Sequence, residues 1–164
     1  MTFNSKLNFD THISSIIARA KQRLYLLRKC FTSCNEYALI RAFKCYVIPL
    51  LEYCCQVWSP SSLSDILRLE SVQRAFTRSL YSCFSLSYRE RLIKCNLQSL
   101  EYRRLCADLT LFYKVVYKLT DINFGESLKP VQQSVTRGHS KRYVIPASRL
   151  NCRKNFFINR TIPI

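Results

Sequence analysis

Apolar residues recur at helical spacing through the first two thirds of the chain. Between residues 10 and 31 they fall every three or four positions and define one face of a helix. Asp10 stands just before this run, where an N-cap residue is expected. The inward positions of this first predicted helix are Ile13, Ile16, Ile17, Ala20, Leu24, Leu27 and Phe31.

A second apolar run begins after Ser33 or Asn35, either of which fits an N-cap, and ends near Trp58. Pro49 interrupts the run, and proline removes a backbone donor and clashes with the preceding turn. We therefore expect either one kinked helix or two separate helices. The predicted inward stripe of this run is Leu39, Phe43, Tyr46, Val47, Leu50 and Cys54.

Three further helical patterns cover residues 63–82, 87–95 and 99–120. Ser87 and Glu90 have capping-box spacing at the start of the second pattern, and Ser99 is the predicted cap of the third. Short polar segments join the five runs. This arrangement is typical of a mainly α fold, a bundle of about five helices.

The pattern changes near Asp121. Residues 127–164 contain eight lysines and arginines, no acidic residue and three of the five prolines, and helical periodicity is lost. We predict a helical domain over 1–120 and a basic, mostly extended tail with little regular structure over 121–164. Within this tail, a strand is expected at 143–145 and a short element near Phe156.

The charge balance narrows the class of partner. The chain has 164 residues, 26 of them Lys or Arg and 10 Asp or Glu, for a formal charge of +16. Such a charge repels itself in a compact state unless a polyanion neutralises it, which favours nucleic acid over a generally basic surface with no partner. A membrane partner is not expected, because the most apolar stretch, residues 46–58, is short and interrupted by polar residues.

Residues that could carry catalysis are scarce. The acidic residues form no Asp-Asp pair or acidic triplet of the kind that holds catalytic metal ions. Two glycines disfavour a phosphate-binding loop, and nine cysteines without a Cys-x-x-Cys pair give no zinc spacing. We expect no enzyme, no cofactor and no metal. Free thiols and a polar start without a signal peptide favour a reduced nuclear or cytoplasmic location.

Several ordered motifs resemble one protein family. They lie at residues 7–13 (LNFDTHI), 20–24 (AKQRL), 46–60 (YVIPLLEYCCQVWSP), 69–74 (LESVQR), 87–92 (SYRERL), 97–104 (LQSLEYRR), 136–140 (TRGHS) and 155–160 (NFFINR). Together they resemble the region that follows the palm in reverse transcriptases of LINE-type (non-LTR) retrotransposons of the jockey and chicken-repeat kind. The resemblance spans nearly the whole chain.

The resemblance implies a thumb-side region that grips a template–primer duplex next to a palm domain. It also implies a fragment truncated at both ends, because the family's aromatic-Ala-Asp-Asp catalytic motif and its N-terminal endonuclease have no counterpart here. The expected function is therefore nonspecific binding of RNA or DNA without catalysis. The alternative is a structural or interaction protein, or a remnant with no selected role.

Basic residues also alternate with aromatic ones, as at 23–25, 102–104 and 141–143, which suits phosphate contact together with base stacking. Cations of the tail and of two helices are the predicted phosphate ligands. They are Lys21, Arg28, Arg103, Arg104, Arg137, Lys141, Arg142, Arg153, Lys154 and Arg160.

Overall fold

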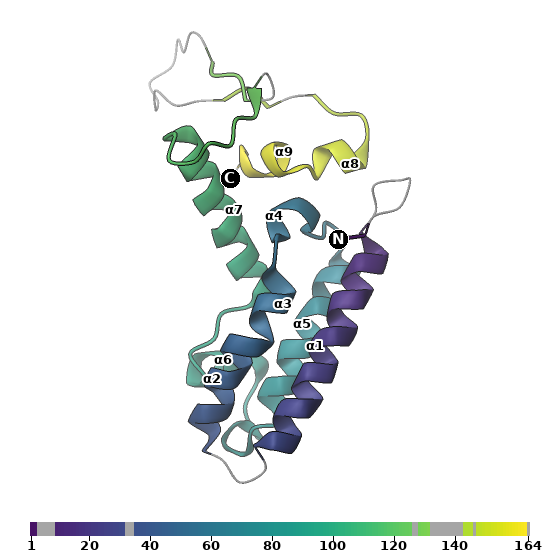
Figure 1. The fold of residues 1–164 in the computed structure, drawn as a ribbon, viewed down its shortest axis with the longest axis vertical. Helices are drawn as coiled ribbons and strands as arrows, with labels where there is room; N and C mark the ends of the chain where they lie inside the picture. The colour runs from purple at the N-terminus through teal and green to yellow at the C-terminus, as the bar shows by residue number, and fades with distance from the viewer. Residues whose placement is uncertain (3–8, 32–34, 126–127, 132–142, 146, 164) are drawn as a thin grey trace. The chain divides into compact units, whose positions relative to one another are not determined.

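The chain is mainly helical, as predicted. The computed structural model describes residues 1–2, 9–31, 35–125, 128–131, 143–145 and 147–163 (Figure 1). Its helices are α1 (Asp10–Cys30), α2 (Glu36–Tyr46), α3 (Ile48–Glu52), α4 (Cys55–Trp58), α5 (Leu63–Arg78), the 3-10 helix η1 (Tyr81–Cys83), α6 (Tyr88–Lys94), α7 (Leu100–Val116), α8 (Asn151–Lys154) and α9 (Phe157–Thr161). Packing contacts divide the chain into unit 1 (Met1–Leu105) and unit 2 (Cys106–Ile164).

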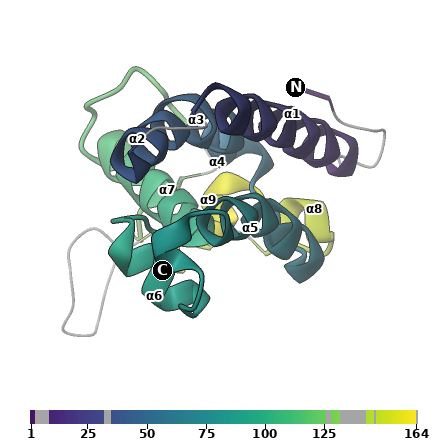
Figure 2. The same cartoon turned by 90° about the horizontal axis from the view of Figure 1, so that it is seen from below.

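Unit 1 is a helical bundle. Seen from below, α1, α2 and α3 form one row, and α5 and α6 form the other (Figure 2). The apolar stripe of α1 packs against α5 and α3, and its predicted inward residues from Ile13 to Leu27 are buried. At the centre, the rings of Phe43 and Phe76 stack 3.9 Å apart and nearly parallel. Burial of these rings supplies much of the driving force that holds the two rows together.

Side-chain caps begin α2 and α6, whereas α1 and α5 begin without one. Asn35, one of the two predicted candidates, caps α2 by accepting a hydrogen bond from the backbone N–H of Tyr37. Ser87 and Glu90 form the predicted capping box of α6. The prediction for Asp10 was wrong: Phe9 is the N-cap residue of α1, and Asp10 is its first helical residue. An acid in the first turn still stabilises the helix through the helix dipole.

The segment around Pro49 is divided into three short helices. Pro49 occupies the first turn of α3, where its missing N–H costs no hydrogen bond. Cys54 then adopts a left-handed conformation, with φ of 52°, between α3 and α4. Because α2 ends at Tyr46, the predicted inward stripe was wrong there: Tyr46 and Cys54 are both exposed.

Unit 2 begins within α7 and contains the two short helices α8 and α9. Arg160 of α9 forms a bidentate ion pair with Asp108 of α7, with N–O distances of 2.9 and 3.0 Å. Phe157 is buried and stacks on Phe124. In the described part of the tail, the region predicted as a strand takes part in a single antiparallel bridge, Pro130 to Tyr143. The short element expected near Phe156 is α9.

The predicted domain division at residue 120 stays a prediction. The two units defined by packing contacts meet between Leu105 and Cys106, inside α7. None of the helices in the described ranges is both long and apolar enough to cross a bilayer.

Candidate nucleic-acid interface

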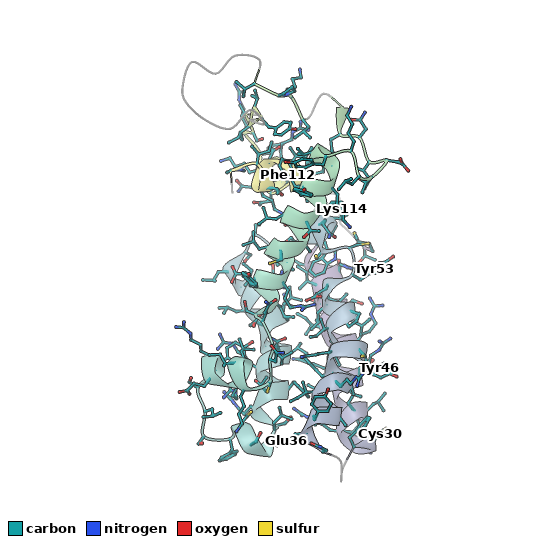
Figure 3. All side chains as sticks on the ribbon, turned by 90° about the vertical axis from the view of Figure 1, so that its left-hand side faces the viewer. Cys30, Glu36, Tyr46, Tyr53, Phe112 and Lys114 are labelled. Carbon is teal, nitrogen blue, oxygen red and sulfur yellow. The ribbon has the colours of Figure 1, made fainter. Side chains whose placement is uncertain are left out.

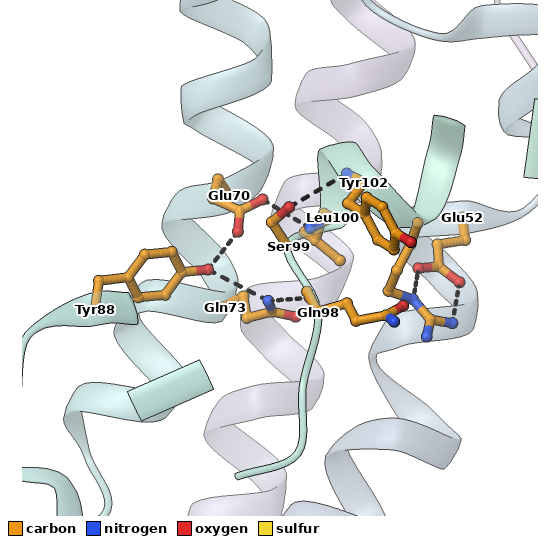
Figure 4. A network of polar contacts seen from close by, with 9 residues as sticks. Glu52, Glu70, Gln73, Tyr88, Gln98, Ser99, Leu100 and Tyr102 are labelled. Atoms are coloured by element: carbon orange, nitrogen blue, oxygen red, sulfur yellow. Dashed lines mark hydrogen bonds and ion pairs between the residues drawn. The ribbon is translucent and has the colours of Figure 1, made fainter. Parts of the chain in front are cut away.

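Glu70 is held inside unit 1 by a polar network (Figure 4). One carboxylate oxygen accepts a hydrogen bond from the Tyr88 hydroxyl, and the other accepts one from the backbone N–H of Leu100 at 3.0 Å. Burial and, next, the hydrogen bond to Glu70 raise the pKa of Tyr88. Gln73 donates to the carbonyl of Gln98 at 2.8 Å. This network joins α5 and α6 to the start of α7.

Glu52 is also bound within the unit. Both of its carboxylate oxygens accept hydrogen bonds from the Arg103 guanidinium, one of them from Nη2 at 2.8 Å. A bidentate pair of this kind fixes the planar guanidinium in one orientation. Arg103, a predicted phosphate ligand, is therefore engaged in linking α3 to α7 in this structure.

Other carboxylates have similar structural roles. Glu36 accepts a hydrogen bond from the backbone N–H of Ser82 at 2.9 Å. Glu90 accepts one from Ser87, and its hydrogen bonds to Ser87 lower the pKa of its carboxyl group. Asp65 pairs with Arg68 at 2.8 Å. The acidic residues of unit 1 described so far thus serve the fold, and they neutralise few of the surface cations.

Lys21 and Arg28 lie on the side of α1 that borders α5. They are seven residues apart and therefore share one helix face with Ser14. Two hydrogen bonds cross to α5: Arg28 Nη2 donates to the carbonyl of Ala75 at 2.9 Å, and Arg68 Nη2 donates to Ser14 Oγ at 2.7 Å. We call Lys21, Arg28 and Arg68 the α1–α5 seam; all three are exposed, and Arg68 also pairs with Asp65. The structure brings the first two predicted ligands together here.

Arg104 has a different position. Its side chain is buried, with 3% of the residue exposed. Within the described residues, its Nη1 and Nη2 atoms have no hydrogen-bond partner. Burial lowers the pKa of the guanidinium, and the nearby charge of Glu70 opposes that effect. A side chain buried in this way does not offer its charge to a phosphate at the surface.

The predicted ligands of the C-terminal region fall into three groups. Arg153 and Lys154 are exposed on α8, and neither forms an ion pair with a described carboxylate. Arg160 is engaged with Asp108, and its guanidinium also donates to the carbonyl of Asn155. The remaining three, Arg137, Lys141 and Arg142, lie outside the described residues.

Sequence reasoning missed a surface formed by α1 and the α2–α3 segment. Tyr46 is 59% exposed and Tyr53 is 75% exposed, and both lie on the same side of the segment (Figure 3). Arg23 of α1 donates through Nη1 to the carbonyl of Tyr46 at 2.9 Å, and Arg19 is exposed one turn earlier. We call Arg19, Arg23, Tyr46 and Tyr53 the tyrosine face. Pro49, three residues after Tyr46, was the available sign that the helix would end early.

The described residues offer no obvious metal centre, because no group of three or more His, Cys, Asp and Glu side chains gathers among them. His12 is buried against the Trp58 ring, and burial is the main cause that lowers its pKa. The thiols of Cys83 and Cys95 are buried 3.8 Å apart. Burial chiefly raises the pKa of the Cys95 thiol to about 12.

The chain is similar to one curated protein, an uncharacterized protein of Caenorhabditis elegans (B0403.1). The two are 29% identical over 124 residues, which cover 72% of this chain and 63% of the relative. The chain thus spans less than two thirds of that relative's length. No family model matches the chain. No solved structure matches it either.

Proposed function

We propose that this chain binds nucleic acid through its phosphates, without catalysis of its own, in the manner of a thumb-side region of a non-LTR retrotransposon reverse transcriptase. The observation that carries the proposal is that several acidic side chains bond within the fold, whereas many basic side chains remain exposed. Glu36, Glu52, Asp65, Glu70 and Asp108 bond to groups within the fold. Exposed cations are left along both units, among them Lys21, Arg74, Arg78, Arg89, Lys114, Lys118, Arg149, Arg153 and Lys154.

This distribution favours a polyanionic partner. Exposed like charges repel one another, and a phosphate backbone relieves that repulsion while releasing its own condensed counterions. The α1–α5 seam is the best-defined contact, because hydrogen bonds to Ala75 and Ser14 hold Arg28 and Arg68 on one side of the bundle. The motif resemblance adds template–primer duplex as the specific ligand and a palm domain as a further partner.

A salt titration of binding tests the proposal. Fluorescence anisotropy with a labelled RNA–DNA hybrid, a DNA duplex and an RNA duplex is expected to give dissociation constants of about 10⁻⁴ to 10⁻⁶ M at physiological salt. Affinity should fall steeply as salt rises, because each phosphate contact contributes about 0.9 to the logarithmic slope. Absence of binding to all three at low salt would overturn the proposal.

Lys21→Gln tests the seam directly. Removing one phosphate contact is expected to reduce the duplex salt slope by about 0.9. Gln22→Ala is the matched control, because Gln22 is the next residue of α1, is also exposed and carries no charge. An unchanged slope in Lys21→Gln would remove this residue from the interface.

Primer extension tests the absence of catalysis. With Mg²⁺, template, primer and deoxynucleotides, the purified chain is expected to add no nucleotide. Synthesis by the chain would show that it carries a polymerase centre and would contradict this part of the proposal.

A further inference from the structure

The tyrosine face combines exposed aromatic rings with exposed guanidinium groups. Tyr46 closes α2 and Tyr53 follows α3, and Figure 3 shows both labelled side chains on the same side of unit 1. Arg19 and Arg23 are one turn apart on α1, so they share a face of that helix. The hydrogen bond from Arg23 to the Tyr46 carbonyl places these two elements side by side.

The carboxylates nearest to these tyrosines in sequence do not neutralise this face. Glu52, the neighbour of Tyr53, is bound on both oxygens by Arg103. Glu36, at the start of α2, accepts a hydrogen bond from the backbone of Ser82. The positive charge of Arg19 and Arg23 therefore remains available to a ligand at the surface.

We infer that the tyrosine face binds a single-stranded segment of nucleic acid, with unpaired bases stacked on Tyr46 and Tyr53 and phosphates held by Arg19 and Arg23. This inference rests on the proposed function and adds a second site to it. In a duplex the bases are already paired and stacked, so exposed rings gain little from duplex contact. An unpaired strand presents both base faces for stacking and phosphates for the arginines.

The two sites would then bind different forms of nucleic acid, a duplex at the α1–α5 seam and an unpaired strand at the tyrosine face. The α1–α5 seam is defined by three cations, which suit a phosphate backbone. Tyr25 is also exposed between Lys21 and Arg28 on α1, and the Lys29 ammonium lies 5.0 Å from the centroid of its ring. The tyrosine face is defined by both cations and exposed rings, which suits a strand whose bases are open. Since both RNA and DNA single strands offer these groups, the shared chemistry is an unpaired strand.

The test is binding of twelve-nucleotide strands, dT12 and U12, and of a DNA duplex to the full chain by fluorescence anisotropy. Tyr46→Leu/Tyr53→Leu is expected to weaken binding of both strands at least about tenfold, since each stacked base contributes about fivefold or more and two rings are removed. Duplex affinity is expected to change less than about twofold. Tyr46→Phe/Tyr53→Phe keeps the rings and should keep strand affinity near that of the parent chain.

The chain supplies a matched control. Tyr37 is 68% exposed and lies nine residues before Tyr46, about 180° around α2. Tyr25 is exposed two residues after Arg23, about 200° around α1. Tyr25→Leu/Tyr37→Leu removes two exposed rings that lie elsewhere, and it should leave strand affinity unchanged. If Tyr46→Leu disturbs folding, as judged by circular dichroism, Tyr53→Leu alone is measured.

Arg19→Gln sharpens the test through electrostatics. One phosphate contact contributes about 0.7 to the salt slope for a single strand, so the slope should fall by that amount. Equal strand affinity in Tyr46→Leu/Tyr53→Leu and the parent chain would overturn the inference while leaving duplex binding intact. Loss of strand binding in the control pair would equally contradict it. If neither strands nor duplex bind the parent chain, the proposed function itself fails.

Discussion

In unit 1, aromatic and aliphatic side chains from successive helices are buried, with Phe43 stacked on Phe76 and Trp58 packed against His12. In unit 2, the described buried residues are few, and a charged pair, Asp108 with Arg160, joins α9 to α7. Unit 1 also contains a bidentate pair, Glu52 with Arg103, and unit 2 also buries Phe157, so the two parts differ in the proportion of apolar burial and not in kind. The stabilisation from apolar burial does not change with the charge state of the chain. An ion pair stabilises only while both partners are present, because removing one leaves the other charge buried and unpaired.

Removing a core ring should produce the largest effect. Phe76→Ala is expected to lower the free energy of unfolding of unit 1 by about 3–5 kcal/mol, because it removes buried apolar surface and leaves a cavity against Phe43. Urea unfolding followed by circular dichroism measures the change. Tyr37→Ala, at an exposed site, should change it by less than about 0.5 kcal/mol. Equal losses in the two variants would refute the description of this core.

Breaking the ion pair should act on unit 2. Asp108→Ala leaves the Arg160 guanidinium without its bidentate partner, at a local cost of about 3 kcal/mol. Hydrogen exchange should quicken at the amides of α9, while those of α5 keep their protection. Asp121→Ala, at an exposed acid of the same unit, is the control and should leave α9 unchanged. Unaltered exchange in Asp108→Ala would show that the pair does not hold α9.

Acidification should weaken unit 1 through His12. Burial lowers the pKa of His12 below its ordinary value of 6.5, so the folded state favours the neutral ring. Its contribution to stability is present above pH 6.5 and is lost as the pH falls through the folded pKa. Melting temperature is expected to fall between pH 7 and pH 5 in the parent chain. His12→Gln should flatten that part of the profile, and an identical slope in both would contradict the assignment.

The rate of thiol labelling should distinguish the buried cysteines from the exposed ones. Cys30, Cys45 and Cys152 are exposed and should react quickly with a disulfide reagent in the folded chain. Cys83 and Cys95 are buried, and the raised pKa of Cys95 further reduces its reactive thiolate. These two should react only as unit 1 opens. Serine substitution of each cysteine assigns the rates, and fast labelling of Cys83 in the folded chain would disprove its burial.

Local signals in the sequence predicted most of the fold. Helical periodicity located α1, α5, α6 and α7, and the Ser87–Glu90 spacing located a cap that the structure contains. The helices α8 and α9 are too short to show periodicity, so only a short element near Phe156 was expected. Tyr46 was assigned to the core because helical spacing groups it with Leu39 and Phe43, but it is the last residue of α2 and its side chain is exposed.

The candidate site was less predictable, because exposure of a cation depends on partners that are distant in the sequence. Arg103 pairs with Glu52 and Arg160 with Asp108, each across about fifty residues. Sequence composition could not separate these paired arginines from exposed ones such as Arg153. It also could not show that Arg104, the neighbour of Arg103, is buried.

The structural roles of the carboxylates affect which substitutions evolution would tolerate in this chain. Losing Glu70 would remove one partner of the part-buried Tyr88 hydroxyl and the partner of the buried Leu100 N–H, which costs stability whether or not the chain has a ligand. Losing an exposed lysine such as Lys21 would cost the fold almost nothing. In a lineage that had stopped binding nucleic acid, surface lysines and arginines would therefore erode first while Glu70 and Glu52 endured. If related chains instead keep these surface lysines and arginines, selection has acted on the positive charge.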